Sequence, residues 1–190
     1  MNAYDFDNTI YDGESIFDFF KFCIKKDISL IKFFPKVLIR LIEYKLNKLS
    51  MEKLYETAEE IINYFIKNSK YTIEELTKQF WDKNIKKLKP NFINKLKKED
   101  LIITGCPNFL INHIKDQLKV ENIICTEYNF ETNEIEFICL GENKVKKFNE
   151  KYKNVKINKF YTDSLIDSPF MKCAKEAYMV KGNKITKINI

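Results

Sequence analysis

The stretch Tyr4-Asp5-Phe6-Asp7-Asn8-Thr9 (YDFDNT, residues 4–9) decides what fold is expected for this chain. In an extended strand the side chains alternate between two faces, so Asp5 and Asp7 share one face while Phe6 points to the opposite, buried face. Two carboxylates this close together cannot both stay ionised in a dry pocket unless a cation or a shared proton compensates. The stretch therefore predicts a divalent metal site at a strand end, and Mg²⁺ suits an oxygen-only ligand set.

Length and composition indicate a globular chain. Its 190 residues, of which 45% are hydrophobic and 14% aromatic, suffice for one domain, or for a core domain with a smaller insert. The five cysteines are scattered without CxxC spacing, which argues against a disulfide framework and a zinc site. Asp5 and Asp7 interrupt the N-terminus before a secretory apolar run can form, so we expect a cytoplasmic protein.

The formal net charge of +6 comes from lysines spread along the chain with acidic residues between them. We interpret them as a solvated surface, and the alternative is a positive field that attracts anionic substrates. No basic block with interleaved aromatic residues is present, so we expect no nucleic-acid partner. The most apolar region, residues 28–46, is interrupted by Lys32, Lys36 and Arg40 and is not expected to cross a bilayer.

Helical spacing of apolar residues extends from Glu14 to about Leu88, directly after a predicted first strand over residues 2–6. Ser50 is a candidate N-cap within this run. Thr72 followed by Glu75 predicts a capping box at a fourth helix, which we expect to end at Pro90.

Strands and helices alternate after this helical run. We expect strands over residues 101–104, 123–126, 157–162 and 177–180, helices over 107–118 and 142–152, a helix start at 169–173, and a β-hairpin over 127–139. This order predicts the α/β class with a doubly wound parallel sheet. Ligands bind such sheets at the carboxyl ends of the strands, where Asp5, Thr104 and Asp163 all fall.

Four motifs in this order resemble those of the haloacid dehalogenase-like phosphohydrolase superfamily. They are DFDNT at residues 5–9, LIIT at 101–104, GENK at 141–144 and YTDSLID at 161–167. The resemblance implies a Rossmann-like catalytic core formed by residues 1–13 and 90–190. It also implies that residues 14–89 form an inserted all-α cap of the C1 type, which closes over the active site.

The resemblance also implies roles for the motif residues in hydrolysis of a phosphate monoester. Asp5 is the expected nucleophile, which forms an aspartyl-phosphate, and Asp7 the expected general acid and base. The Thr104 hydroxyl and the backbone N–H of Gly105 are expected to bind the phosphoryl group. Lys144 is expected to neutralise negative charge, with Lys146 and Lys147 as neighbouring alternatives.

The same resemblance implies a Mg²⁺ site formed by Asp5, the backbone carbonyl of Asp7, and Asp163. Asp167 is expected to support the metal through water or to orient Lys144.

The substrate is expected to be a small phosphorylated metabolite. The helical insert resembles subgroup IB, which contains the phosphoserine phosphatases. Glu14 has the spacing of the acid that contacts the substrate amino group there, and its alternative role is a helix first-turn acid. The fourth motif departs from the glycine-rich Asn-Asp form of those enzymes, which leaves the substrate open.

Two other functions stay open from the sequence. One is a lipid-phosphate phosphatase of the phosphatidylglycerophosphate type, which would associate with the membrane surface through an apolar and basic cap helix around residues 31–41. We favour packing within the cap for its apolar stripe, and a surface position for Arg40 over a clamp on a substrate carboxylate. The other is a non-catalytic phosphate-binding regulatory module. We find no sequence signal for an oligomeric state.

Overall fold

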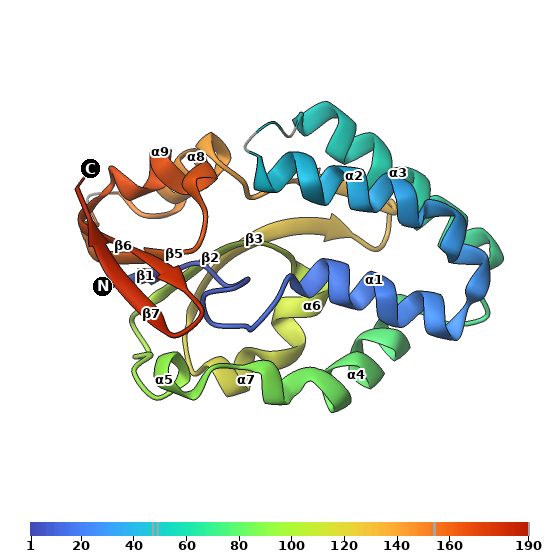
Figure 1. Ribbon diagram of the computed structural model, residues 1–190, viewed down its shortest axis with the longest axis horizontal. Helices are drawn as coiled ribbons and strands as arrows, with labels where there is room; N and C mark the ends of the chain where they lie inside the picture. Colours follow the sequence, from blue (N-terminus) through green and yellow to red (C-terminus); the bar gives the residue numbers. More distant parts are fainter. Residues whose placement is uncertain (47, 49, 154, 190) are drawn as a thin grey trace.

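The computed structural model describes the whole chain except residues 47, 49, 154 and 190. The described residues form one seven-stranded sheet in the order β4-β3-β2-β1-β5-β6-β7 (Figure 1). Its strands are β1 (Ala3–Tyr4), β2 (Leu101–Pro107), β3 (Asn122–Asn129), β4 (Glu134–Phe137), β5 (Ile157–Thr162), β6 (Ala174–Lys181) and β7 (Lys184–Ile188).

The five inner strands of this sheet are parallel, and the edge strands β4 and β7 are antiparallel to their neighbours. Tyr4 of β1 is in register with Ile102 of β2 and with Tyr161 of β5. The carboxyl ends of these three strands therefore meet at one edge of the sheet. The predicted doubly wound α/β fold is confirmed, as is the predicted hairpin, which β3 and β4 form.

Strand β7 was not expected from the sequence. The chain turns at Gly182, whose φ of 59° is in the left-handed region that favours glycine, and β7 returns antiparallel to β6. Most of the side chains of β7 are exposed. The alternation of apolar and polar residues that identifies a half-buried strand is therefore weak there.

The helix predicted over residues 107–118 is present from Asn108 to Leu118 but is divided into short segments. Strand β2 continues to Pro107, and three short segments follow, α6 (Asn108–Ile111), η3 (Asn112–Ile114) and α7 (Lys115–Leu118). Pro90 also differs from expectation, because α4 ends at Asn84 and η2 (Ile85–Lys87) follows it. Pro90 instead begins α5 (Pro90–Ile93), where its missing N–H leaves no bond unmade.

The helical segments between β1 and β2 are α1 (Ser15–Lys26), η1 (Ile28–Phe33), α2 (Phe34–Lys45), α3 (Met51–Asn68), α4 (Ile73–Asn84), η2 and α5. The predicted caps are confirmed. The Ser50 hydroxyl accepts from the backbone N–H of Lys53, and Thr72 and Glu75 form a reciprocal capping box. None of the described helices combines the length and the apolar character that crossing a bilayer requires.

Helices cover both faces of the sheet. Helix α8 (Glu142–Lys151), η4 (Leu165–Asp167) and α9 (Ser168–Met171) lie over one face, and α5, α6 and α7 over the other (Figure 1). Helices α2 and α3 lie beside the β3–β4 hairpin, where the Tyr55 hydroxyl accepts from the backbone N–H of Ile138 at 3.0 Å. They are thus placed close to the carboxyl edge of the sheet.

Helix α4 packs directly against the sheet layer. The Trp81 indole N–H donates to the Leu110 carbonyl at 3.0 Å, and its ring makes edge contacts with Phe6 and Tyr11. Phe80 of the same helix packs edge-on against Phe19 of α1. One hydrophobic cluster therefore continues from the sheet into α1 and α4. The division into a core (1–13 and 90–190) and a cap (14–89) stays a prediction.

Candidate active site

A tight loop after β1 positions the two aspartates of the first motif. Strand β1 ends at Tyr4, and the Asp5 N–H still donates to the Tyr161 carbonyl at 2.8 Å. The Phe6 carbonyl then accepts from three following backbone N–H groups, and Asn8 has a φ of 53°. Phe6 is fully buried, as the sequence predicts. Asp7, however, is placed by this loop, because the strand does not extend that far.

A buried lysine joins the first, third and fourth motifs. Lys144 Nζ lies 2.9 Å from Asp5 Oδ1 and 2.8 Å from Asp167 Oδ2, and the Thr162 hydroxyl donates to the same Asp167 oxygen at 2.7 Å. Lys144 is 1% exposed, and both carboxylates are buried. Lys147, on the same helix, instead pairs with Glu127 at 3.0 Å. Of these two lysines, Lys144 is the one that reaches the sheet edge.

Burial and charge act against each other on this lysine. Burial favours the neutral form of an amine, but Asp167 and Asp5 outweigh it and raise the pKa of Lys144 above its ordinary value. The ammonium therefore stays charged between two carboxylates. A fixed positive charge in a low-dielectric site interacts strongly with any anion that enters.

Carboxylates crowd the same edge of the sheet. Burial raises the pKa of Asp5 to about 7 against the opposing effect of Lys144, with Asp167 and Asp163 adding to the rise. Burial and the nearby Glu14 raise the pKa of Asp163 to about 6. One lysine thus leaves negative charge uncompensated, and such an oxygen-rich set favours a bound cation.

Asp7 lies at the N-terminus of α1, where one of its carboxylate oxygens accepts from the Ser15 N–H at 2.8 Å. Burial, with the neighbouring Glu14, raises its pKa well above the ordinary range. A raised pKa makes a carboxyl better suited to be a general acid. Glu14 itself accepts from the Asn8 amide at 2.8 Å.

Thr104 and Gly105 lie where β2 reaches the site. The Thr104 hydroxyl is fully buried and accepts from the Cys106 N–H at 3.0 Å, whereas Gly105 lines a cavity. A Cβ at Gly105 would come within 2.8 Å of the Leu140 side chain. A side chain at this position would therefore have to displace the end of the Leu140 side chain.

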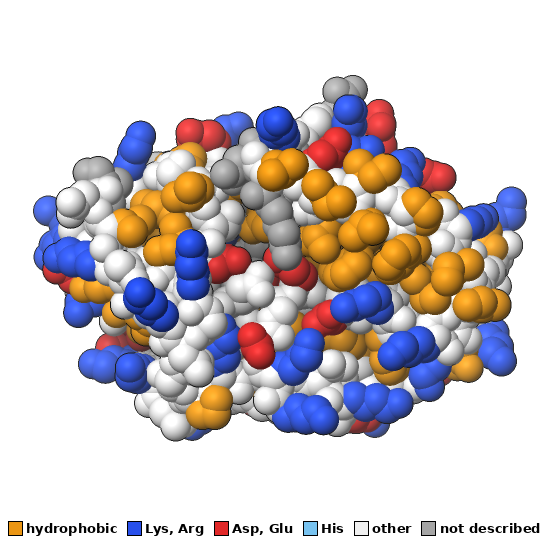
Figure 2. Space-filling model, in the orientation of Figure 1, with side chains coloured by type: hydrophobic (Ala, Val, Ile, Leu, Met, Phe, Trp, Pro, Cys, Tyr) orange, Lys and Arg blue, Asp and Glu red, His pale blue; other side chains and the backbone are white. Residues whose placement is uncertain are grey.

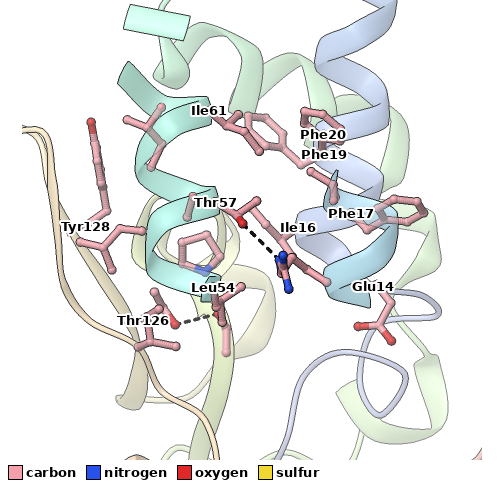
Figure 3. A pocket seen from close by; sticks show the side chains of 18 of the residues that line it. Glu14, Ile16, Phe17, Phe19, Phe20, Leu54, Thr57, Ile61, Thr126 and Tyr128 are labelled. Atoms are coloured by element: carbon pink, nitrogen blue, oxygen red, sulfur yellow. Dashed lines mark hydrogen bonds between the residues drawn. The ribbon is translucent and has the colours of Figure 1, made fainter. Parts of the chain in front are cut away.

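That cavity, of about 290 Å³, opens from the carboxylates into the space between the sheet and helices α1, α2 and α3. Asp5, Asp7 and Glu14 are among the residues that line it. Figure 3 shows Phe19 and Phe20 of α1 across this cavity from Leu54, Thr57 and Ile61 of α3.

Two residues of α2 in this cavity were not assigned there from the sequence. The expected surface position for Arg40 is wrong, because its side chain is 17% exposed and lines the cavity, paired with Glu43 and bonded to the Thr57 hydroxyl at 3.2 Å. Tyr44 lies one helical turn further on and also lines the cavity, and burial, with the charges of Asp5, Asp167 and Asp163, raises its pKa well above its ordinary value. Arg40 and Tyr44 are four residues apart and therefore share one face of α2, and this spacing is the sequence signal that could have placed them together.

Residues 3–172 match the family model described as haloacid dehalogenase-like hydrolase. No curated protein matches the sequence. Several solved structures share the fold. One is a protein with unknown function from Bordetella pertussis Tohama I, with 15% identity, coverage of 93% of this chain and 87% of that one, and a TM-score of 0.73.

Two further similar structures have names that refer to an activity. A phosphoserine phosphohydrolase-like protein from Francisella tularensis subsp. tularensis SCHU S4 has 16% identity, coverage of 93% and 86%, and a TM-score of 0.57. A phospho-aspartyl intermediate analogue of phosphoserine phosphatase has 17% identity, coverage of 92% and 83%, and a TM-score of 0.52. At these identities the similarity establishes the fold alone.

Proposed function

The chain belongs to the haloacid dehalogenase-like hydrolase family, and we propose that it is a Mg²⁺-dependent phosphatase that cleaves a phosphate monoester of a small metabolite through an aspartyl-phosphate. The observation that carries this proposal is the buried contact of Lys144 with Asp5 and Asp167, beside the protonatable Asp7. A carboxylate nucleophile, a fixed cation and a general acid are the groups that this hydrolysis needs.

The first step transfers the phosphoryl group to the protein. An Asp5 oxygen attacks phosphorus, the bond from phosphorus to the alcohol oxygen breaks, and Asp7 gives its proton to that oxygen. Lys144 stabilises the charge of the transferring group and of Asp5. Asp167, held by the Thr162 hydroxyl, keeps the lysine in place.

The second step releases phosphate. The Asp7 carboxylate takes a proton from a water molecule, the water oxygen attacks phosphorus, and the bond to Asp5 breaks. The raised pKa of Asp7 fits both directions of this proton transfer. Gly105 lines the cavity next to Asp5, so its backbone N–H is the proposed phosphoryl donor, with Thr104 behind it as a second contact.

The donor set fits Mg²⁺. Among the residues that the structure describes, no three Asp, Glu, His or Cys side chains are arranged to hold a metal ion by themselves. Mg²⁺ usually takes only one or two carboxylates and completes its shell with water and substrate phosphate. Asp5, Asp163 and the Asp7 carbonyl would hold it, and Asp167 acts through Lys144. When bound, it would neutralise charge on the phosphate oxygens.

Glu14 supports a phosphoserine-like substrate, because it lines the cavity beside Asp7 and could pair with an amino group. The names of two similar structures, quoted above, refer to phosphoserine. Residues 14–89 are the proposed cap over this substrate, and α2 and α3 are its parts nearest to the cavity.

A second candidate is a lipid-phosphate phosphatase at a membrane surface. Figure 2 shows hydrophobic side chains gathered over the region of α2, with basic side chains at the border. The exposed hydrophobic side chains of this region include Ile31, Leu38, Ile39, Ile42 and Leu46. The expected packing of the apolar stripe within the cap is therefore wrong for Ile31 and Leu38. The regulatory-module alternative has no such observation in its favour.

Phosphate release from a panel of phosphorylated metabolites, with Mg²⁺ and with a chelator, tests the proposal. We expect release that needs the metal and that the Asp5→Asn variant lacks. Release that survives chelation would remove Mg²⁺ from the proposal. Absence of release from every substrate, by protein whose folding is verified by circular dichroism, would favour the regulatory module.

A further inference from the structure

The cavity behind the catalytic carboxylates is apolar along most of its wall. Its lining includes Phe17, Phe20, Leu41, Leu54, Ile61 and Phe65. These side chains come from three helices, and they line the same cavity as Asp5. Figure 3 shows Phe20, Leu54 and Ile61 around it. A phosphate held at Asp5 would therefore direct the rest of its substrate into hydrocarbon surroundings.

Several polar side chains of the lining already have partners. Arg40 is paired with Glu43 and bonded to Thr57. The Thr126 hydroxyl donates to the Gly105 carbonyl at 2.8 Å, and the Tyr128 hydroxyl donates to Asn133 at 3.1 Å. Apart from the carboxylates and Tyr44, the lining therefore offers a polar substrate body few hydrogen bonds to replace those that it loses with water, which counts against such a body.

The size of the cavity limits what it can hold. Its volume of about 290 Å³ is roughly twice that of an engineered apolar cavity that holds one benzene molecule. An apolar group of about twelve carbon atoms would fill it, which corresponds to one chain and excludes two long ones.

We propose that the substrate is a phosphate monoester whose alcohol carries a single apolar chain of about eight to twelve carbons, with the phosphate at Asp5 and the chain in this cavity. This inference rests on the proposed phosphatase function and specifies its substrate class. The same chemistry occurs in a free alkyl or prenyl phosphate and in a single-chain lipid phosphate within a bilayer.

A homologous series of n-alkyl phosphates from ethyl to decyl, each below its micellar concentration, tests the inference. Each buried methylene contributes about fourfold, so kcat/KM should rise on the order of 10²-fold from ethyl to hexyl and level off once the cavity is full. Phosphoserine should fall near the ethyl end. A flat series, with measurable turnover of ethyl phosphate, would overturn the inference and leave the phosphatase function intact.

Two variants of α3 test whether the increase in kcat/KM with alkyl-chain length depends on this cavity. Ala58→Phe places a ring in the lining, and the ratio of decyl to ethyl turnover should fall toward one. Glu59→Phe adds the same ring at an exposed neighbouring position and should keep the wild-type ratio. Equal ratios of decyl to ethyl turnover in both variants, with unchanged melting temperatures, would show that the alkyl chain binds elsewhere and would overturn the inference.

A further measurement separates the failure of the inference from that of the phosphatase function. Binding of the alkyl phosphates to the wild-type protein is followed by calorimetry. Chain-dependent binding without turnover would refute catalysis and support the ligand class, whereas neither binding nor turnover would refute both. Turnover of a ten-carbon lysophosphatidate, measured free in solution and in phosphatidylcholine vesicles, shows whether the substrate is taken from solution or from a bilayer. Turnover in either form supports the inference, and turnover in neither form contradicts it.

Discussion

Removing the ammonium of Lys144 should cost both stability and activity. The variant Lys144→Met keeps an unbranched side chain of similar length but leaves Asp5 and Asp167 without their shared cation. At the observed distances of 2.9 and 2.8 Å, each ion pair has a Coulomb energy of about 6 kcal/mol at an effective dielectric constant of about 20. Because the cost of burying the ammonium also disappears, the expected net loss of unfolding free energy is about 3–5 kcal/mol.

Urea unfolding followed by tryptophan fluorescence measures this loss. The chain has a single tryptophan, Trp81, which is buried against Phe6 and Tyr11 and so reports on the core. The matched control is Lys147→Met on the same helix, whose partly exposed pair with Glu127 should contribute no more than about 1 kcal/mol. Phosphatase activity of Lys144→Met should fall about 10²- to 10³-fold, since one charge-stabilising donor is lost.

Two results would refute this reasoning. The first is a Lys144→Met protein as stable and as active as the Lys147→Met control. The second concerns the double variant Lys144→Met/Asp167→Asn, which should recover part of the lost stability because one unpaired buried carboxylate has been removed. If the double variant is less stable than Lys144→Met by the full cost of Asp167→Asn alone, the two residues are not coupled.

The remaining predictions concern single aspartates. Asp5→Asn should abolish turnover while leaving the fold intact, because an amide cannot be the nucleophile, and substantial residual phosphate release would refute the assignment. Asp7→Asn should lower kcat about 10²- to 10⁴-fold, and an unchanged rate would remove Asp7 from the mechanism. Burial alone would raise the pKa of Asp18, but hydrogen bonds from Lys21, Lys87 and Tyr11 outweigh it and lower this pKa. The ionised Asp18 therefore stabilises the fold above the ordinary aspartate pKa, and this stabilisation is lost as pH falls through the lowered pKa of the folded protein. The free energy of unfolding of Asp18→Asn should therefore be about 1–2 kcal/mol lower than that of the wild type at pH 7. This difference should close as pH falls below the ordinary aspartate pKa, and a constant difference would contradict the linkage.

The motif residues could be located from the sequence because of one topological rule. The carboxyl ends of parallel strands meet at a common edge, so Asp5 and Asp163 were expected to lie together, and each follows a strand of the central sheet. The preference for Lys144 over Lys147 depended on the resemblance. In the structure a difference of three residues along α8 separates a buried lysine from a partly exposed one.

The cavity could not be predicted in the same way. Its wall combines residues from α1, α2, α3 and the β3–β4 hairpin, and the packing of these elements against each other has no local sequence signal. The broken helix after β2 has a similar cause. Residues 107–118 have apolar residues at helical spacing, which predicts a single helix. In the structure this segment also makes tertiary contacts, such as the hydrogen bond from the Trp81 indole N–H to the Leu110 carbonyl, and it forms three short helical segments.

Helix α2 shows why its apolar stripe admitted two interpretations. A helix that is apolar around most of its circumference needs an apolar environment on more than one side. Val37 and Leu41 line the cavity, while Ile39 and Ile42 are 50% and 49% exposed on the outside. In the lipid-phosphate alternative, the wall that would hold a substrate chain would also be the wall nearest to the lipid surface. Substitution of Ile39 and Ile42 by serine should leave the alkyl-chain preference of free substrates unchanged and weaken turnover only of substrates presented in vesicles, which separates recognition of the chain from association with a membrane.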